Sequence, residues 1–155
     1  MADEHAGENE QERLNRNLDE LLQELRVTQT GVQILTGFLL TLPFTQRFPE
    51  LDDLQRYAYL GVLVGSVLAT GLIIAPVAFH RMLFRRGQRR WLVRNANRAA
   101  RLGLLALAVT TSGVVWLVFD LVTDRTVAGV AGALSLVFFG ALWAAYPLLA
   151  SPDRD

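Results

Sequence analysis

Four long apolar runs, separated by shorter polar segments, dominate the pattern along the chain. Runs of this kind are typical of membrane-spanning helices, because about 20 residues rising ~1.5 Å each cross a ~30 Å hydrocarbon core. The turn at 123–126 is so short that the last two runs must be antiparallel neighbours. We predict an all-α membrane protein with four transmembrane helices in two antiparallel hairpins. The predicted spans cover residues 27–44, 57–79, 102–122 and 127–149.

The segment before the first span has two parts. Residues 1–10 are polar and acidic, with little apolar surface to bury, which predicts disorder. Over 11–26, leucines recur at spacings of three and four residues, which indicates an amphipathic N-terminal helix beside the membrane. This helix either lies in the interface or pairs with a partner helix, or it extends the first span and packs on the protein itself. Residues 150–155 form a charged tail.

The first span is the least apolar of the four, and its polar positions follow one helical face. Gln29, Gln33 and Thr36 are the candidates for a polar intramembrane face. Such a face belongs against other helices, because an amide in hydrocarbon is costly. It either forms hydrogen bonds between helices or lines a path for an ion or solute.

Small residues mark a packing stripe in the second span. Gly61, Gly65 and Ala69 recur every four residues, which permits close approach of another helix. Tyr57 and Tyr59 stand at the beginning of this span, as expected of an aromatic belt at the membrane interface.

The segment 80–101 between the second and third spans carries eight arginines and no acidic residue. A basic loop of this kind stays in the cytoplasm, so with four spans both termini are cytoplasmic as well. We interpret the segment as a topogenic loop that contacts anionic lipid at the cytoplasmic face. No nucleic-acid recognition module accompanies it, so we expect no nucleic-acid partner. The arginines are Arg81, Arg85, Arg86, Arg89, Arg90, Arg94, Arg98 and Arg101.

The candidate chemistry is sparse. The chain has no cysteine and two histidines, which excludes thiolate catalysis and sulfur-ligated metals. We find no acid–base or nucleophile constellation, and we expect no enzyme activity, no cofactor and no metal site. The adjacent carboxylates Asp52 and Asp53 fit a helix N-cap better than a calcium site.

Two groups are candidate titrating residues. Asp120 is the one carboxylate within a predicted span, and it is either functional or an interfacial carboxylate that water reaches. His80 belongs at the opposite, cytoplasmic level beside Arg81, where it either binds a lipid phosphate or extends to the interface.

Three stretches resemble a family of small four-span actinobacterial membrane proteins catalogued as a domain of unknown function. They are LDELLQELRVTQTGVQILTGFLLTLPFTQRF at 18–48, APVAFHRMLFRRGQR at 75–89, and the ANRAARLG that follows. The resemblance implies a multi-pass protein of the bacterial plasma membrane. Some relatives carry the label of sodium/proton antiporter, and the resemblance implies no catalytic or ligand residues.

Two functions remain open from the sequence. The first is a structural, interaction or accessory component of the membrane, which acts as a homo-oligomer or with a membrane-protein partner. The second is a small oligomeric ion or proton-coupled transporter. Carboxylates near mid-membrane are usual in proton-coupled transport, and this sequence has none there.

Overall fold

The computed structural model describes residues 2–83 and 89–145, and within them the chain is helical without a strand. This confirms the predicted all-α class. Two short 3₁₀ turns, η1 and η2, connect the first two helices, and a π-helical turn, η3, follows the last one. The main helices are α1 (Ala2–Thr41), α2 (Asp53–Leu83), α3 (Arg89–Val122) and α4 (Arg125–Gly140); the short turns are η1 (Leu42–Phe44), η2 (Phe48–Glu50) and η3 (Ala141–Ala145).

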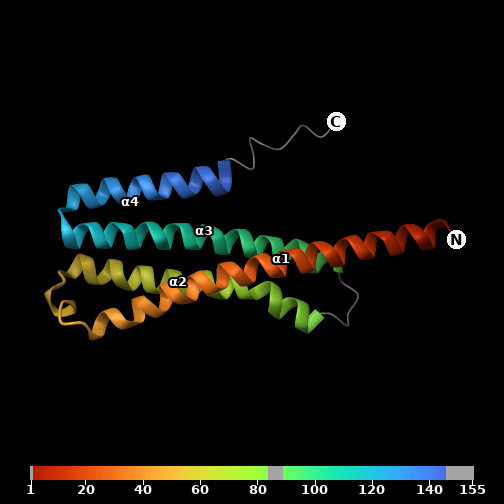
Figure 1. The fold of residues 1–155 in the computed structure, drawn as a ribbon, viewed down its shortest axis with the longest axis horizontal. Coiled ribbons are helices and arrows are strands. Elements are labelled where there is room, and N and C mark those ends of the chain that lie inside the picture. The colour runs from red at the N-terminus through yellow and green to blue at the C-terminus, as the bar shows by residue number, and fades with distance from the viewer. Residues whose placement is uncertain (1, 84–88, 146–155) are drawn as a thin grey trace.

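The four helices form two antiparallel hairpins, as Figure 1 shows. The α1–α2 connection and the α3–α4 turn lie together at one end, which we call the loop end. The start of α1, the end of α2 and the start of α3 lie at the other end, which we call the arginine end. α1 lies across α2, while α4 packs along α3 at the edge of the bundle.

Three of the helices are long and apolar enough to cross a membrane. Their apolar segments are Asp53–Phe79 in α2, Arg94–Val122 in α3, and Arg125–Trp143 through α4 and η3. The predicted spans 57–79 and 102–122 lie within the first two. The last part of the predicted fourth span, 146–149, lies outside the described residues.

α1 is not among these three segments, so the predicted span at 27–44 remains a prediction. α1 is a single helix of 40 residues, which corresponds to about 60 Å. It joins the predicted helix at 11–26 to the predicted span without a break. It also continues to Ala2, which differs from the disorder expected for 1–10. Ala, Glu, Gln and Arg are good helix formers, and adding a turn to an existing helix costs far less than nucleating a new one.

An apolar seam holds α1 against the bundle. Leu25, Val32 and Leu39 are buried at intervals of seven residues along it. Leu25 and Val32 belong to a cluster with residues of α2 and α3, and Leu39 belongs to a second cluster nearer the loop end. Leu25 shares a cluster with Ala100, and Leu39 shares one with Leu117, so α1 runs parallel to α3, as Figure 1 shows.

α2 and α3 approach each other most closely at glycines. A Cβ atom added to Gly65 would lie 2.5 Å from Thr110 Oγ1. Added at Gly103 it would lie 2.8 Å from Ile73 Cγ1, and at Gly113 it would lie 2.7 Å from Val62 Cγ2. A side chain at any of these three positions would therefore require its neighbour on the other helix to shift. Ala69, from the predicted packing stripe, is fully buried, whereas Gly61 faces open space.

The substitution Gly65→Val tests this contact, and Gly61→Val is its matched control. Both substitutions place the same branched side chain in the same helix, so helix propensity changes equally. We expect Gly65→Val to lower the free energy of unfolding by about 1–3 kcal/mol relative to Gly61→Val, because it overpacks a filled contact. Unfolding in detergent micelles measures the difference. Equal losses in the two variants would contradict the close α2–α3 contact.

Candidate functional site

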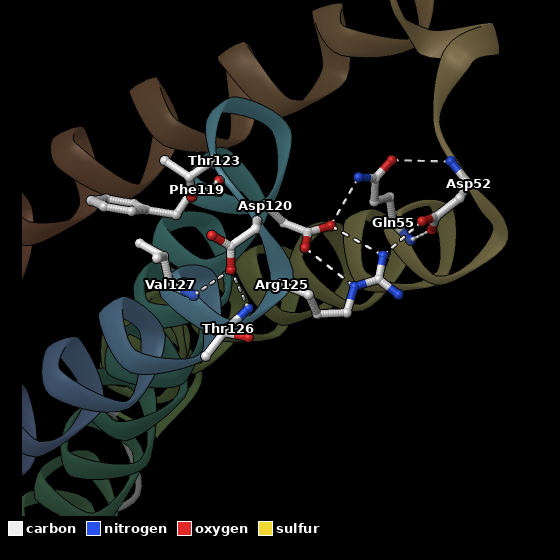
Figure 2. Close-up of polar contacts among 9 residues, drawn as sticks. Asp52, Gln55, Phe119, Asp120, Thr123, Arg125, Thr126 and Val127 are labelled. Carbon is white, nitrogen blue, oxygen red and sulfur yellow. Dashed lines mark hydrogen bonds and ion pairs between the residues drawn. The ribbon is translucent and has the colours of Figure 1, made fainter.

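The most connected group of polar side chains lies at the loop end. It consists of Asp52, Gln55, Asp120 and Arg125, and we call it the loop-end network (Figure 2). Asp52 precedes α2 and Gln55 lies in its first turn. Asp120 lies in the last turn of α3, and Arg125 begins α4. The network therefore draws on both hairpins.

Asp52 and Gln55 form a reciprocal cap at the start of α2. The backbone N–H of Gln55 donates to Asp52 Oδ1 at 2.8 Å, and the backbone N–H of Asp52 donates to Gln55 Oε1 at 3.0 Å. This is the capping-box arrangement, which satisfies backbone donors that a helix start leaves free. It confirms the interpretation of Asp52 as an N-cap. Among the side chains that the structure describes, no group of three or more His, Cys, Asp or Glu residues could hold a metal ion.

Arg125 joins the two hairpins through two carboxylates. Its Nη2 atom lies 2.6 Å from Asp52 Oδ2 and 3.3 Å from Asp120 Oδ2, and its Nε atom lies 3.3 Å from Asp120 Oδ1. The Gln55 amide also donates to Asp120 Oδ2 at 2.8 Å. The Asp120 side chain is only 3% exposed, whereas those of Asp52 and Arg125 are each 52% exposed.

Asp120 has two side-chain partners in the structure. Its carboxylate lies between the Arg125 guanidinium and the Gln55 amide. This carboxylate therefore joins helices in the structure, with both of its oxygens engaged. The two interpretations from the sequence, a functional group or an interfacial carboxylate that water reaches, stay predictions.

Asp52 shows the electrostatic effect of the network outside the apolar segments. The backbone N–H of Gln55 and then the Arg125 side chain hold the pKa of Asp52 below its usual range, against a smaller opposing effect of desolvation. A lowered native pKa means that the stabilisation is present above the ordinary Asp pKa of about 3.9 and is lost as the pH falls through the native value.

The α3–α4 turn is closed by a second N-cap. Asp124 Oδ1 accepts hydrogen bonds from the backbone N–H groups of Thr126 and Val127, at 2.8 and 3.1 Å. The Thr123 hydroxyl donates to the Phe119 carbonyl at 2.7 Å. This two-residue turn confirms that α3 and α4 are antiparallel neighbours, and it fixes Arg125 close to Asp120.

The predicted polar face of the first span does not line the interior. Gln33 is exposed, while Gln29 and Thr36 are half-buried beside the apolar seam of α1. The Thr36 hydroxyl donates to the Val32 carbonyl of its own helix at 2.8 Å. Within the described residues, Gln29 and Gln33 have no hydrogen-bond partner for their side-chain amides.

The two candidate titrating residues lie at opposite ends of the bundle. Asp120 is bonded to Gln55 at the start of α2, whereas His80 lies 25 residues further along the same helix. That separation is about 37 Å of helix, so the two groups do not form one relay. The side chain of His80 lies outside the part of the structure that is described.

The arginine end is basic in the structure as well. Arg81, Arg94, Arg98 and Arg101 are exposed, and the last three share one face of α3 at intervals of four and three residues. Arg89 and Arg90 begin α3, but their side chains are not described. Arg85 and Arg86 lie outside the described residues.

Several structural residues were missed at the sequence level. Gly65 and Ala69 predicted the α2 side of the α2–α3 contact. Gly103 and Gly113, which form its α3 side, were not predicted. The partners of Asp120 were also missed, although D-x-x-Q at 52–55 is a capping-box pattern that could have placed Gln55 at the start of a helix.

The comparisons with known proteins give one result. The profile of a family of unknown function, DUF6328, matches residues 7–147. The chain belongs to this family. The DUF6328 match covers all four main helices in large part, so the bundle described above is a structure of the family's shared region. No curated protein and no solved structure matches the chain.

Loss of an arginine from the loop-end network should lower the thermal stability more than loss of an exposed arginine nearby. Arg125→Gln leaves the Asp120 carboxylate buried with its cation removed, and we expect a lower midpoint of thermal unfolding. The control Arg47→Gln removes an exposed cation from the same end and should leave the midpoint nearly unchanged.

A double variant separates the network from simple loss of a side chain. Asp120→Asn combined with Arg125→Gln removes both charges, so it should be less destabilised than Arg125→Gln alone. A double variant that equals the sum of its two single variants would contradict the coupling between these residues.

Proposed function

We propose that this DUF6328 protein is a multi-pass protein of the bacterial plasma membrane and acts there as a structural, interaction or accessory component, without enzyme activity or a cofactor. Its partners are the lipid bilayer and a membrane protein, which is either a second copy or another chain. The observation that carries this proposal is the distribution of apolar surface, which lies mainly on the outside of the bundle.

The apolar helices bury little of themselves within one chain. In the most apolar 18-residue stretch of α2, and likewise of α3, only 28% is buried within the chain. In the corresponding stretch that begins in α4, 6% is buried. Exposed side chains include Val64 of α2, Val109 of α3, and Leu134 and Val137 of α4, each at least 57% exposed. Contiguous apolar surface on this scale favours contact with lipid or with other membrane helices.

The packing of α1 supports a fourth span. Its buried seam from Leu25 to Leu39 follows the apolar segments of α2 and α3 for about 21 Å. A layer of hydrocarbon that surrounds α2 and α3 would therefore surround this part of α1 as well. Three threonine hydroxyls in this part of α1 donate to carbonyls of the helix itself, which lowers the cost of such a position.

Charge supports the orientation. The arginine end belongs in the cytoplasm by the positive-inside rule, and with four spans both termini lie there too. Arg94, Arg98 and Arg101 form an exposed basic face that suits anionic lipid headgroups. The loop end then faces outward, where Asp52 and Asp120 are both paired with Arg125.

Transport receives less support than an interaction role. The buried polar side chains that the structure describes are few: Ser66, Thr110 and Ser112, together with the Tyr59 hydroxyl, which donates to the Leu39 carbonyl. The two serine hydroxyls donate to carbonyls of their own helices. A groove of about 510 Å³ between α2 and α3 is lined almost entirely by apolar groups, with Thr110 as its one hydroxyl. An ion needs oxygen ligands or water along its path, and these surfaces offer neither in number.

A flux measurement tests the proposed role. The purified protein, reconstituted in liposomes, should give no sodium, potassium or proton flux above that of empty liposomes. Flux well above that background would overturn the interaction role and favour a transporter. The variant Gln33→Leu would then show whether the polar residues of α1 form the path. A lower flux in this variant than in wild type would mean that Gln33 contacts the ion or its water.

A further inference from the structure

We propose that α1 is a dimer interface, at which the Gln33 amide pairs with Gln33 of a second copy of the chain. This inference rests on the proposed function, because it requires α1 to cross the membrane. It also makes the partner specific, since the proposed interaction component then interacts with itself through a defined helix face.

The depth of Gln33 makes its exposure costly. Val32, the preceding residue, packs in one cluster with Ala69 and Ile73 of α2. Ala69 lies sixteen residues from the start and ten from the end of the apolar segment Asp53–Phe79, or about 24 and 15 Å of helix. The Gln33 amide thus lies well inside the apolar layer. An amide without a partner there costs several kcal/mol in the absence of water.

Other polar groups on this side of α1 are already satisfied. The Thr30 hydroxyl donates to the Arg26 carbonyl at 3.2 Å, and the Thr41 hydroxyl donates to the Phe38 carbonyl at 2.7 Å. Within the described residues the Gln33 side chain, in contrast, is exposed and has no partner. Gln33 is therefore the group on this face that gains most from an external hydrogen bond.

The surroundings of Gln33 permit a second helix to approach. Gly37, one turn further along the same face, has nothing within 4 Å of the position of a Cβ atom. Ile34 and Phe38 beside it are 57% and 72% exposed. Small residues together with an amide are typical of contacts between membrane helices, because they allow both close packing and a hydrogen bond.

Symmetry favours a second copy as the occupant. Copies inserted in the same orientation are related by a twofold axis along the membrane normal, so their α1 helices run parallel. Gln33 of one copy then meets Gln33 of the other at the same depth. An amide carries both a donor and an acceptor, so two of them satisfy each other without any further group. Lipid chains cannot supply either group.

Single cysteines locate the interface, since the chain has no cysteine of its own. Ile34→Cys places a thiol beside Gln33, while Val64→Cys on α2 and Val130→Cys on α4 are matched controls at the same 57% exposure. Oxidation in native membranes should give a disulfide-linked dimer from Ile34→Cys and little from the two controls. A dimer from either control, with none from Ile34→Cys, would overturn the proposed face.

Substitution of Gln33 tests the hydrogen bond itself. In liposomes, the dissociation constant of the dimer should rise about 3- to 16-fold in Gln33→Leu, since hydrogen bonds between membrane helices are worth ~0.6–1.7 kcal/mol. Gln33→Asn retains an amide and should keep most of the affinity. Single-molecule photobleaching at several protein-to-lipid ratios measures both. Equal affinity for wild type and Gln33→Leu would overturn the amide pair.

The outcomes separate this inference from the proposed function. A stable complex with a different membrane protein, without the Ile34→Cys dimer, would overturn the α1 dimer and leave the interaction role intact. Ion flux from the reconstituted protein would overturn the interaction role, whether or not α1 dimerises. A protein that is monomeric in liposomes at every ratio, with no Ile34→Cys disulfide in membranes, would overturn the dimer.

Discussion

A hydrocarbon layer of the kind proposed above offers no hydrogen bonds, and this constraint accounts for many of the hydrogen bonds that polar side chains form near the apolar segments. Threonines of α1 donate to their own helix, and the Ser66 and Ser112 hydroxyls donate to carbonyls one turn earlier in α2 and α3. Asp120 is paired with Arg125 and Gln55 at the point where α3 ends. Among the side chains described near these segments, Gln29, Gln33, Thr110 and Thr111 have no such partner, and Gln33 is the exposed one, which is why α1 is the helix that the account depends on most.

The two ends of the bundle differ in how their charges are arranged. At the loop end, Arg125 is paired with both Asp52 and Asp120, so these ion pairs join the two hairpins. At the arginine end, the exposed basic face of α3 is directed outward. A buried carboxylate is destabilising without its cation, whereas the exposed arginines suit the contact with anionic lipid that is proposed above.

Much of the architecture could be predicted from local pattern. The apolar runs placed α2 and α3, and the short turn at 123–126 predicted the antiparallel packing of α4 on α3. These features depend on neighbouring residues, so a single sequence contains them. That the helix at 11–26 continues into the first span was one of the alternatives from the sequence. Its start at Ala2 was not predicted, because composition alone argued for disorder in the first ten residues, whereas helix extension from the packed part is inexpensive.

Contacts between distant segments could not be predicted. Gln55 and Asp120 are 65 positions apart, and nothing local indicates that the Gln55 amide donates to the Asp120 carboxylate. Tyr59 was expected at the interface, but it is buried and donates to the Leu39 carbonyl of α1, an arrangement that depends on how α1 crosses α2. The orientation of α1 could not be predicted either, because both its apolar seam and its polar face were candidates for packing against the other helices. The seam at Leu25, Val32 and Leu39 is buried, which leaves Gln33 outside.

The claim that α1 crosses the membrane as a fourth span is tested most directly by the sidedness of its two ends. Three single-cysteine variants report on this sidedness. Gln46→Cys places a thiol just beyond the end of α1, Thr123→Cys places one at the same end of the bundle, and Ala2→Cys places one at the start of α1. In intact cells, a membrane-impermeant maleimide should label the cysteines at 46 and 123 and should reach the cysteine at 2 only after the cells are permeabilised. Labelling of the cysteines at 2 and 46 from the same side would contradict the account, because α1 would then lie along the membrane surface.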